Sequence, residues 1–458
     1  MGFDSFEFWL LFLGILGAYH ILSSLALRNG FLLICSYLFY ASWSWHFLPI
    51  ILISTVTDYF CGFMVEAGNS TKKRNWGLGI SLFINLGMLF LFKYTHDLFP
   101  STDFLKNFSR WGIPLGISFY TFQTLSYTFD VYKGKIKHTK NIVNFALYVS
   151  FFPQLIMGPI EKARRLLPQL ESQRKVSFRQ LHEGVYLITL GLFKKIFVAN
   201  SLSVPVDAIF SGSTPSSGLA LVASLLMVCQ VYCDFSGYSD MARGMARLFG
   251  IKLMVNFKPF FTSYRPSQFW QNWHISLTEW IRDYMVLPFR DKKKREGHLY
   301  IQLLLIMAMV GLWHRATWNW LCFGLMHGAA IVVDRFLAKQ RWKLPAWCFR
   351  SFGYLSMLTI YVLSGALHRS QDWTQFTKMI SSILQCQPWG HETTALLIYA
   401  SQFLLPLFMF ETIQLKTKNE FYILDRSPWI QGIFWGVALS AILILSRWAP
   451  QGFLYYSF

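Results

Sequence analysis

The sequence predicts an all-α, polytopic membrane protein with about eleven transmembrane helices and additional re-entrant or interfacial helices. Three observations lead to this fold class. Hydrophobic residues make up 54% of the 458 residues and charged residues only 14%, whereas soluble domains carry about 25% charged residues. The apolar residues are gathered in long runs, and the polar stretches between the runs are short. A chain so poor in charge needs lipid around it.

Apolar runs follow one another from the N-terminus to the C-terminus. Several reach the roughly 20 residues that a helix needs to cross a hydrocarbon core, and the shorter ones are expected to be tilted, broken or re-entrant. The acidic segment Met1–Glu7, with no small-residue cleavage site after the first run, favours a retained membrane helix over a signal peptide. The runs are Phe8–Leu27, Phe31–Ile53, Trp76–Phe92, Phe145–Met157, Tyr186–Leu202, Ser217–Tyr232, Ile301–Leu312, Trp318–Val333, Phe352–Leu367, Thr394–Phe410 and Ile430–Leu445.

The polar connections contain no evident internal repeat and no low-complexity tract. None of them is long enough to form a soluble domain, because such domains have at least about 50 residues. The sequence therefore predicts a single integral-membrane domain over residues 1–458.

The chain is strongly basic, with 42 Lys and Arg against 23 Asp and Glu and a formal net charge of +19. The excess lies in clusters between apolar runs, as expected for cytoplasmic loops that also contact anionic headgroups. Membrane lipid explains this charge, so it does not call for nucleic acid. A basic cytoplasmic face would also attract an anionic donor such as coenzyme A. The clusters are Lys72–Arg74, Lys133–Lys137, Lys162–Lys175, Lys292–Arg295 and Lys339–Lys343.

The seven cysteines are scattered and lie mostly inside apolar runs. They predict no disulfide framework. Cys229 and Cys233 are four residues apart, but no paired His or Cys is near them in the sequence, so we expect no metal site.

Three stretches interrupt the alternation of apolar helix and short loop. Trp111–Tyr132 is rich in hydroxyl side chains and must lie against protein or a wet cavity. In Phe152–Arg165, Gly158-Pro159 ends a helix and a basic interfacial element follows. Asp234–Arg295 has the greatest density of polar and aromatic residues.

Within the third stretch, one amphipathic helix is predicted from Pro266 to Tyr284. Apolar and aromatic residues recur there every three or four positions, among them Trp270, Trp273 and Leu277. His274 falls on the aromatic side, where a charged imidazole is unfavourable.

His314 lies in the next apolar block, between Trp313 and Trp318. An ionisable side chain at membrane depth is a functional candidate. Desolvation favours its neutral form, which can take a proton from a hydroxyl and later return it to a leaving group. The alternative from the residues alone is a structural histidine. There is no G-x-S-x-G elbow and no phosphate-binding Gly loop, which argues against a hydrolase or a kinase.

Several long motifs, in the same order, resemble bacterial membrane-bound O-acyltransferases of the alginate and peptidoglycan O-acetylation branch. The teichoic acid D-alanylation protein is a more distant resemblance. The resemblance covers most of the chain. The motifs are PLGISFYTFQTLSYTFDVYKG at Pro114–Gly134, FFPQLIMGPI at Phe151–Ile160, DFSGYSDMARGMARLFGI at Asp234–Ile251, WHISLTEWIRDY around His274, GLWHRATWNW around His314 and GLMHG around His327.

The resemblance implies many helices around a central tunnel that crosses the membrane, with His314 as the essential catalytic histidine and His274 as the second. His327 is a third motif histidine, for which a structural role is expected. A polar motif that includes Ser236 is expected to shape the tunnel wall. The tunnel or substrate-lining candidates are Trp273, Trp313, Arg315, Trp318, Asn319, His327, Asp234, Tyr238, Asp240 and Gln123.

The resemblance also implies the substrates, the partners and the location. Acetyl-CoA, or an acyl carrier protein, would donate the acyl group on the cytoplasmic side of a bacterial inner membrane. No permanently bound cofactor is expected. The acceptor would be an extracytoplasmic polysaccharide, reached directly or through a secreted acetyltransferase or esterase-like partner protein. The candidates for the donor entrance are Lys292, Lys293, Lys294 and Arg295.

The sequence departs from the family pattern at Arg315, where relatives have Gly, and at Gln271-Asn272, where they have basic residues. These differences leave the donor and the acceptor open: peptidoglycan, alginate-like polymer, cellulose or teichoic acid. His314 can act as general base, or it can belong to an acyl-enzyme relay. Three different functions stay open as well: D-alanyl transfer, transfer of a long acyl chain to lipid or protein, and a transporter or channel, although no repeated halves support the transporter.

Overall fold

The computed structural model describes residues 2–68, 70–98, 112–212, 214–289, 296–340 and 345–445, and these ranges are helical, with no strand among them. By length and composition, seven of the described helices could cross a membrane: Leu25–Glu66, Thr71–Tyr94, Phe178–Ser211, Ser217–Leu248, Glu296–His314, Trp318–Lys339 and His391–Thr417. Two shorter apolar helices are Phe6–Ile21 and Pro428–Ile444. The prediction of an all-α, polytopic membrane protein is confirmed.

The chain divides into two compact units. One consists of Met1–Ile188, Tyr238–Asn256 and Glu279–Tyr284, and the other of Thr189–Gly237, Phe257–Thr278 and Met285–Phe458. The chain passes between them several times, so neither unit is one continuous segment. That residues 1–458 form a single domain stays a prediction.

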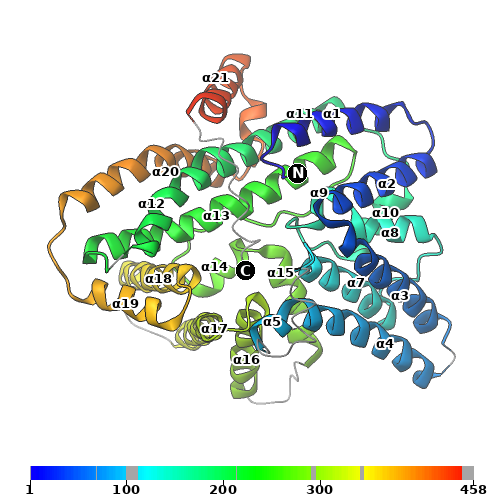
Figure 1. Ribbon diagram of the computed structural model, residues 1–458, viewed down its shortest axis with the longest axis horizontal. Helices are drawn as coiled ribbons and strands as arrows, with labels where there is room; N and C mark the ends of the chain where they lie inside the picture. Colours follow the sequence, from blue (N-terminus) through cyan, green and yellow to red (C-terminus); the bar gives the residue numbers. More distant parts are fainter. Residues whose placement is uncertain are drawn as a thin grey trace. The chain divides into compact units, whose positions relative to one another are not determined.

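The first unit is built from helices of the N-terminal part of the chain, of which α3, α4 and α7 lie side by side (Figure 1). Its helices are α1 (Phe6–Ile21), α2 (Leu25–Ser44), η1 (Trp45–Phe47), α3 (Leu48–Glu66), α4 (Thr71–Leu89), η2 (Phe90–Tyr94), α5 (Thr95–Leu98), α7 (Ile117–Tyr132), α8 (Ile142–Ser150), α9 (Phe152–Leu155) and α10 (Ala163–Glu171). Most of α11 (Phe178–Leu192), the last part of α13 (Ser217–Leu248) and the first residues of η4 (Arg282–Val286) complete it.

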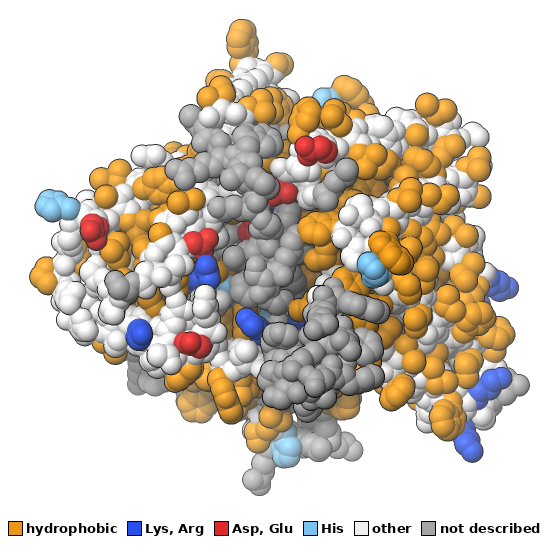
Figure 2. All heavy atoms as spheres, viewed as in Figure 1, with side chains coloured by type: hydrophobic (Ala, Val, Ile, Leu, Met, Phe, Trp, Pro, Cys, Tyr) orange, Lys and Arg blue, Asp and Glu red, His pale blue; other side chains and the backbone are white. Residues whose placement is uncertain are grey.

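The surface of this unit is strongly apolar over α3 and α4 (Figure 2). Phe60, Phe63 and Phe83 are 56%, 54% and 78% exposed. Soluble proteins rarely expose so much contiguous apolar surface. Lipid contact accounts for it.

The polar segment α7 is buried against neighbouring helices, as expected from its hydroxyl side chains. Thr128 donates to the Asp58 carboxylate at 3.0 Å, and Asn85 donates to the other oxygen at 2.6 Å. Gly116 begins the helix with φ 71°, and a Cβ there would lie 2.4 Å from the Leu155 carbonyl oxygen. Only glycine fits this close approach.

Several predicted apolar runs do not correspond to single helices, and two of them illustrate the reason. The run Phe8–Leu27 is interrupted because α1 ends at Ile21 and α2 begins at Leu25, where the Ser24 hydroxyl accepts from the Leu27 amide at 3.2 Å. The run Phe145–Met157 is divided between α8 and α9. In both cases the apolar pattern continues across a backbone break, since it reports burial and not helix ends.

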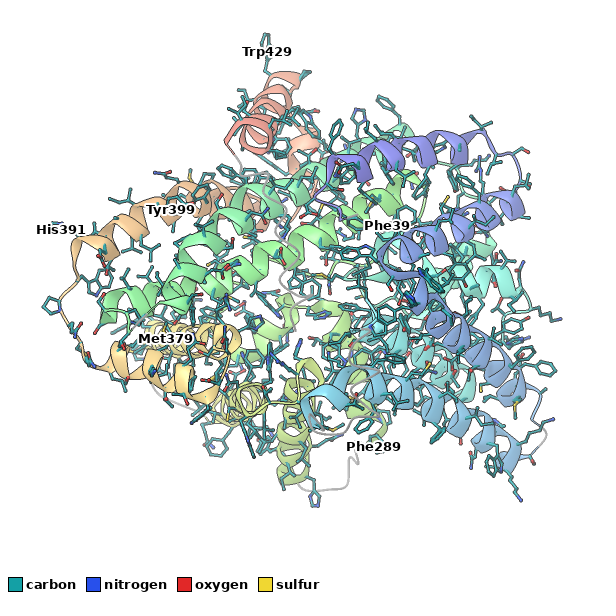
Figure 3. The ribbon with its side chains drawn as sticks, viewed as in Figure 1. Phe39, Phe289, Met379, His391, Tyr399 and Trp429 are labelled. Carbon is teal, nitrogen blue, oxygen red and sulfur yellow. The ribbon has the colours of Figure 1, made fainter. Side chains whose placement is uncertain are left out.

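The second unit contains η3 (Phe193–Ala199), α12 (Asn200–Ser211) and the first part of α13, and α20 packs against α12 (Figure 1). On α20, Tyr399 donates its hydroxyl to the Ser201 carbonyl of α12 at 3.1 Å (Figure 3). The other elements are α14 (Pro266–Asn272), α15 (Ile275–Ile281), η5 (Leu287–Phe289), α16 (Glu296–His314), α17 (Trp318–Lys339), α18 (Ala346–Arg369), α19 (Trp373–Leu384), α20 (His391–Thr417), η6 (Tyr422–Asp425), α21 (Pro428–Ser440) and η7 (Ala441–Leu445). The last residues of α15 belong to the first unit.

Two features of this region differ from the prediction. The apolar run that was expected to end at Tyr232 continues as one helix of 32 residues to Leu248. The predicted amphipathic helix Pro266–Tyr284 is broken at Trp273 and His274, because His274 adopts a left-handed backbone with φ 44°. Its aromatic pattern is thus shared by the short helices α14 and α15 and by η4.

Candidate active site

The second unit contains a partly open cavity of about 70 Å³. Its walls come from helices α13 to α18 and are mainly aromatic and aliphatic. The lining residues are Met227, Val228, Val231, Asp234, Phe235, Phe269, Trp270, Trp273, His274, Leu277, His314, Trp320, Phe323, His327, Tyr361, Ser364, Gly365 and His368. An apolar, aromatic lining with a few polar groups is typical of a small-molecule site.

His314 is the last residue of α16, and close packing of α16 on α17 positions it. A Cβ at Gly311 would lie 2.0 Å from the Trp320 carbonyl oxygen, so only glycine lets the helices approach this closely. The His314 ring stacks on the Trp320 ring, with centroids 4.9 Å apart and an interplanar angle of 27°. The Trp313 ring is tilted against the His314 ring, with centroids 4.7 Å apart. The ring is therefore held by aromatic contacts.

His274 reaches the same cavity from the break between α14 and α15. It is 2% exposed and packs edge-on against Phe235, with centroids 4.8 Å apart. Burial lowers the pKa of His274 to about 3, so its imidazole is neutral at neutral pH. A neutral imidazole has a nitrogen that can accept a proton.

His327, on α17, lies on the wall with its ring fixed by a hydrogen bond. Its Nε2 is 3.0 Å from the Ser364 hydroxyl, and the Phe323 and Trp270 rings pack at 4.5 and 5.3 Å. The structural role expected for His327 stays a prediction.

A fourth histidine, His368 of α18, was missed by the sequence reasoning. Its ring lies 4.8 Å from that of Trp320, which also contacts His314. Trp320 thus connects two histidines of the cavity. In the sequence, His368 directly follows the apolar run Phe352–Leu367, which could have indicated a histidine at membrane depth. The neighbouring Arg369 is instead typical of the membrane interface.

The structure places some of the other predicted residues on the cavity wall and some elsewhere. Trp273 and Asp234 line the cavity, whereas Trp313 is not among the described lining residues and contacts the His314 ring. Two other predicted lining residues, Asn319 and Trp318, follow His314 in the sequence. Asn319 donates to the Ser370 carbonyl at 3.1 Å, and Trp318 is 73% exposed. Trp318 therefore does not line the cavity in the described structure, because it begins α17 on the outer side of the helix pair.

Arg315 follows His314 in the loop between α16 and α17 and is partly exposed. Within the described ranges it is not one of the residues on the cavity wall.

Three predicted lining residues belong to the first unit, whereas the cavity lies in the second. Gln123 donates to the Tyr148 carbonyl, Tyr238 stacks on Phe3 and Asp240 pairs with Arg243 at 3.1 Å. The predicted donor entrance Lys292–Arg295 lies outside the described residues. Among the described residues, no group of three or more His, Cys, Asp or Glu side chains could hold a metal ion.

Comparison with known proteins gives a family match over most of the chain. A family model described as MBOAT, membrane-bound O-acyltransferase family, matches residues 38–354, which include His274, His314 and His327. The chain is 35% identical to the probable alginate O-acetylase AlgI of Pseudomonas putida over 85% of this chain and 81% of that protein. It is 29% identical to the peptidoglycan O-acetyltransferase of Helicobacter pylori over 99% of this chain and 96% of that protein. It is 28% identical to the teichoic acid D-alanyltransferase of Streptococcus thermophilus over 59% of this chain and 67% of that protein.

Proposed function

Since this chain belongs to the membrane-bound O-acyltransferase family, we propose that it transfers an acetyl group for the O-acetylation of an extracytoplasmic polysaccharide. The chain is a multi-pass membrane O-acyltransferase. The names of its relatives, alginate O-acetylase and peptidoglycan O-acetyltransferase, support acetyl as the group and a polysaccharide as the acceptor. D-alanyl transfer has less support, because the D-alanyltransferases match a smaller share of the chain.

The observation that carries the proposal is the cavity that brings His314 and His274 to one aromatic wall. In the proposed reaction, His314 takes the proton of the acceptor hydroxyl while the hydroxyl oxygen attacks the acyl carbonyl carbon. The imidazolium then returns the proton to the leaving thiolate. His274, neutral and held by Phe235, supports the same cavity as a hydrogen-bonding group. The apolar walls exclude water, which would otherwise hydrolyse the thioester.

We further propose acetyl-CoA as the donor, with an acyl carrier protein as the alternative, and a bacterial inner membrane as the location. Both donors are anionic, which fits the net charge of +19. A secreted acetyltransferase or esterase-like protein would receive the acetyl group if the transfer to polymer is indirect. The cavity has room for a group as small as acetyl, and a folded protein could not enter it.

Replacement of His314 tests this function. His314→Ala should abolish polymer-bound acetate, released from cells by mild alkali, and leave the purified protein folded. His298→Ala is the matched control, because His298 lies on the same helix α16 and is exposed. Acetate at the wild-type level in the His314 variant would remove His314 from the mechanism. A wild-type chain that adds no acetate to any polymer would refute the proposed function.

A further inference from the structure

Two consecutive lysines, Lys194 and Lys195, are buried inside the second unit. They lie on the π-helical segment η3, within the candidate membrane span Phe178–Ser211. Turns of π-helix are rare and often mark functional sites. Charged side chains are unfavourable at membrane depth, so their presence there usually has a functional reason.

Each lysine pairs with a carboxylate on a different helix. Lys195 Nζ lies 2.6 Å from Asp234 Oδ1 on α13, and Lys194 Nζ lies 3.1 Å from Glu411 Oε1 on α20. The four side chains are between 1% and 7% exposed. Tyr232 donates its hydroxyl to the same Glu411 oxygen at 2.7 Å. The two ion pairs therefore connect η3 to α13 and to α20.

The two pairs differ in their relation to the cavity. Asp234 lies on the cavity wall, next in sequence to Phe235, whose ring contacts His274. Lys194 and Glu411 are not among the described residues that line the cavity. A buried ion pair seldom adds net stability, because desolvation of both charges offsets their attraction. Stability alone thus gives no reason for a carboxylate at this wall.

We propose that Lys195 is a positioning residue that fixes the Asp234 carboxylate on the cavity wall, where its negative charge stabilises the imidazolium formed during acyl transfer. The inference rests on the proposed function. The proton goes from the acceptor hydroxyl to the imidazole as the new carbon–oxygen bond forms, and to the thiolate as the carbon–sulfur bond breaks. Without a nearby cation, a buried carboxylate takes up a proton and loses its charge. In an apolar cavity its attraction for the imidazolium is stronger than in water.

Other groups near this wall also titrate or carry charge. They are His274, His314, His327, His368 and Tyr361 on the wall, Lys194 and Glu411 in the second pair, and Arg315 beside His314 in the chain. Because a carboxylate acts on all four imidazoles, the test needs a measurement that is specific for one histidine.

The test compares two variants of the full-length protein in lipid nanodiscs. Lys195→Met/Asp234→Asn removes the pair at the cavity, and Lys194→Met/Glu411→Gln removes the other pair as a matched control. Neither variant leaves an unpaired buried charge. The first measurement is the pH midpoint at which diethyl pyrocarbonate modifies His314, followed by mass spectrometry of its peptide. We expect the midpoint to fall by about one pH unit in the first variant, a tenfold loss of proton affinity, and to stay unchanged in the control.

The second measurement is the turnover of acetyl transfer, which should fall about tenfold in the first variant, in step with the proton affinity, and remain near wild type in the control. If the first variant does not fold, the exchanged pair Lys195→Asp/Asp234→Lys keeps two opposite charges and places the positive one on the wall. In this exchanged variant, the pH midpoint of His314 modification should fall by at least one pH unit, as in the first variant.

Equal midpoints in the two paired variants would overturn the proposal. So would a loss of turnover without a shift of the midpoint, because the pair would then only shape the cavity. The modification needs no substrate. A wild-type protein that transfers no acetyl group therefore refutes the proposed function, while the midpoints still decide the role of the Lys195–Asp234 pair.

Discussion

At the scale of single residues, His274 meets two demands, one on its backbone and one on its side chain. Its φ of 44° lies in the left-handed region, which histidine and asparagine tolerate better than most residues. His274→Asn should therefore keep the turn between α14 and α15 and lose acetyl transfer. His274→Val should in addition strain the backbone by about 1–3 kcal/mol and lower the melting temperature. Full transfer by a folded His274→Asn variant would exclude the imidazole from the reaction.

The burial of His274 also predicts a pH dependence of stability. Its pKa is lowered from 6.5 to about 3, so below pH 6.5 the unfolded chain binds a proton that the folded chain does not bind. The stability from the neutral ring is complete above pH 6.5 and is lost as the pH falls toward 3. Between about pH 7 and pH 4, the melting temperature of His274→Asn should fall less than that of wild type. If the two melting temperatures depended on pH in the same way, the pKa of His274 would not be lowered in the folded protein.

At the scale of helices, the pairing of α16 with α17 sets the position of His314. A Cβ at Gly311 would lie 2.0 Å from the Trp320 carbonyl oxygen, whereas a Cβ at Gly297 on the same helix meets no described atom within 4 Å. Gly311→Ala must separate the helices, and over-packing of this kind costs about 1–3 kcal/mol. We expect a lower melting temperature and reduced acetyl transfer for Gly311→Ala and neither change for Gly297→Ala. Identical behaviour of the two variants would mean that the helices can separate without moving His314.

At the scale of the whole molecule, the distribution of charge predicts the sidedness of the chain. Basic loops face the cytoplasm, so Lys292–Arg295, outside the described residues, should lie on the donor side. The connection between α19 and α20 contains no Lys or Arg and includes the exposed Cys386. A membrane-impermeant maleimide should label Cys386 in intact cells and a cysteine at position 293 only after permeabilisation. Labelling of position 293 from outside would reverse the proposed direction of transfer.

By itself, the sequence determined the class of the protein, and it singled out two histidines as candidate site residues. Membrane insertion follows from composition and from the length of apolar runs, which do not depend on the neighbours of any residue in the fold. The motifs around His274 and His314 are continuous segments, so they could be identified without a structure. The structure brings both histidines to one cavity. Their catalytic roles stay predictions.

The tertiary structure alone decided which elements surround that cavity. An apolar pattern records that a residue is buried and leaves open which partner it meets. Helix α13 continues through Asp234, and the carboxylate of Asp234 pairs with Lys195 of η3. Trp320 and His368 come together from α17 and α18, while Gln123 belongs to the other unit. Each of these arrangements depends on contacts between residues far apart in the sequence. Local periodicity does not encode such contacts.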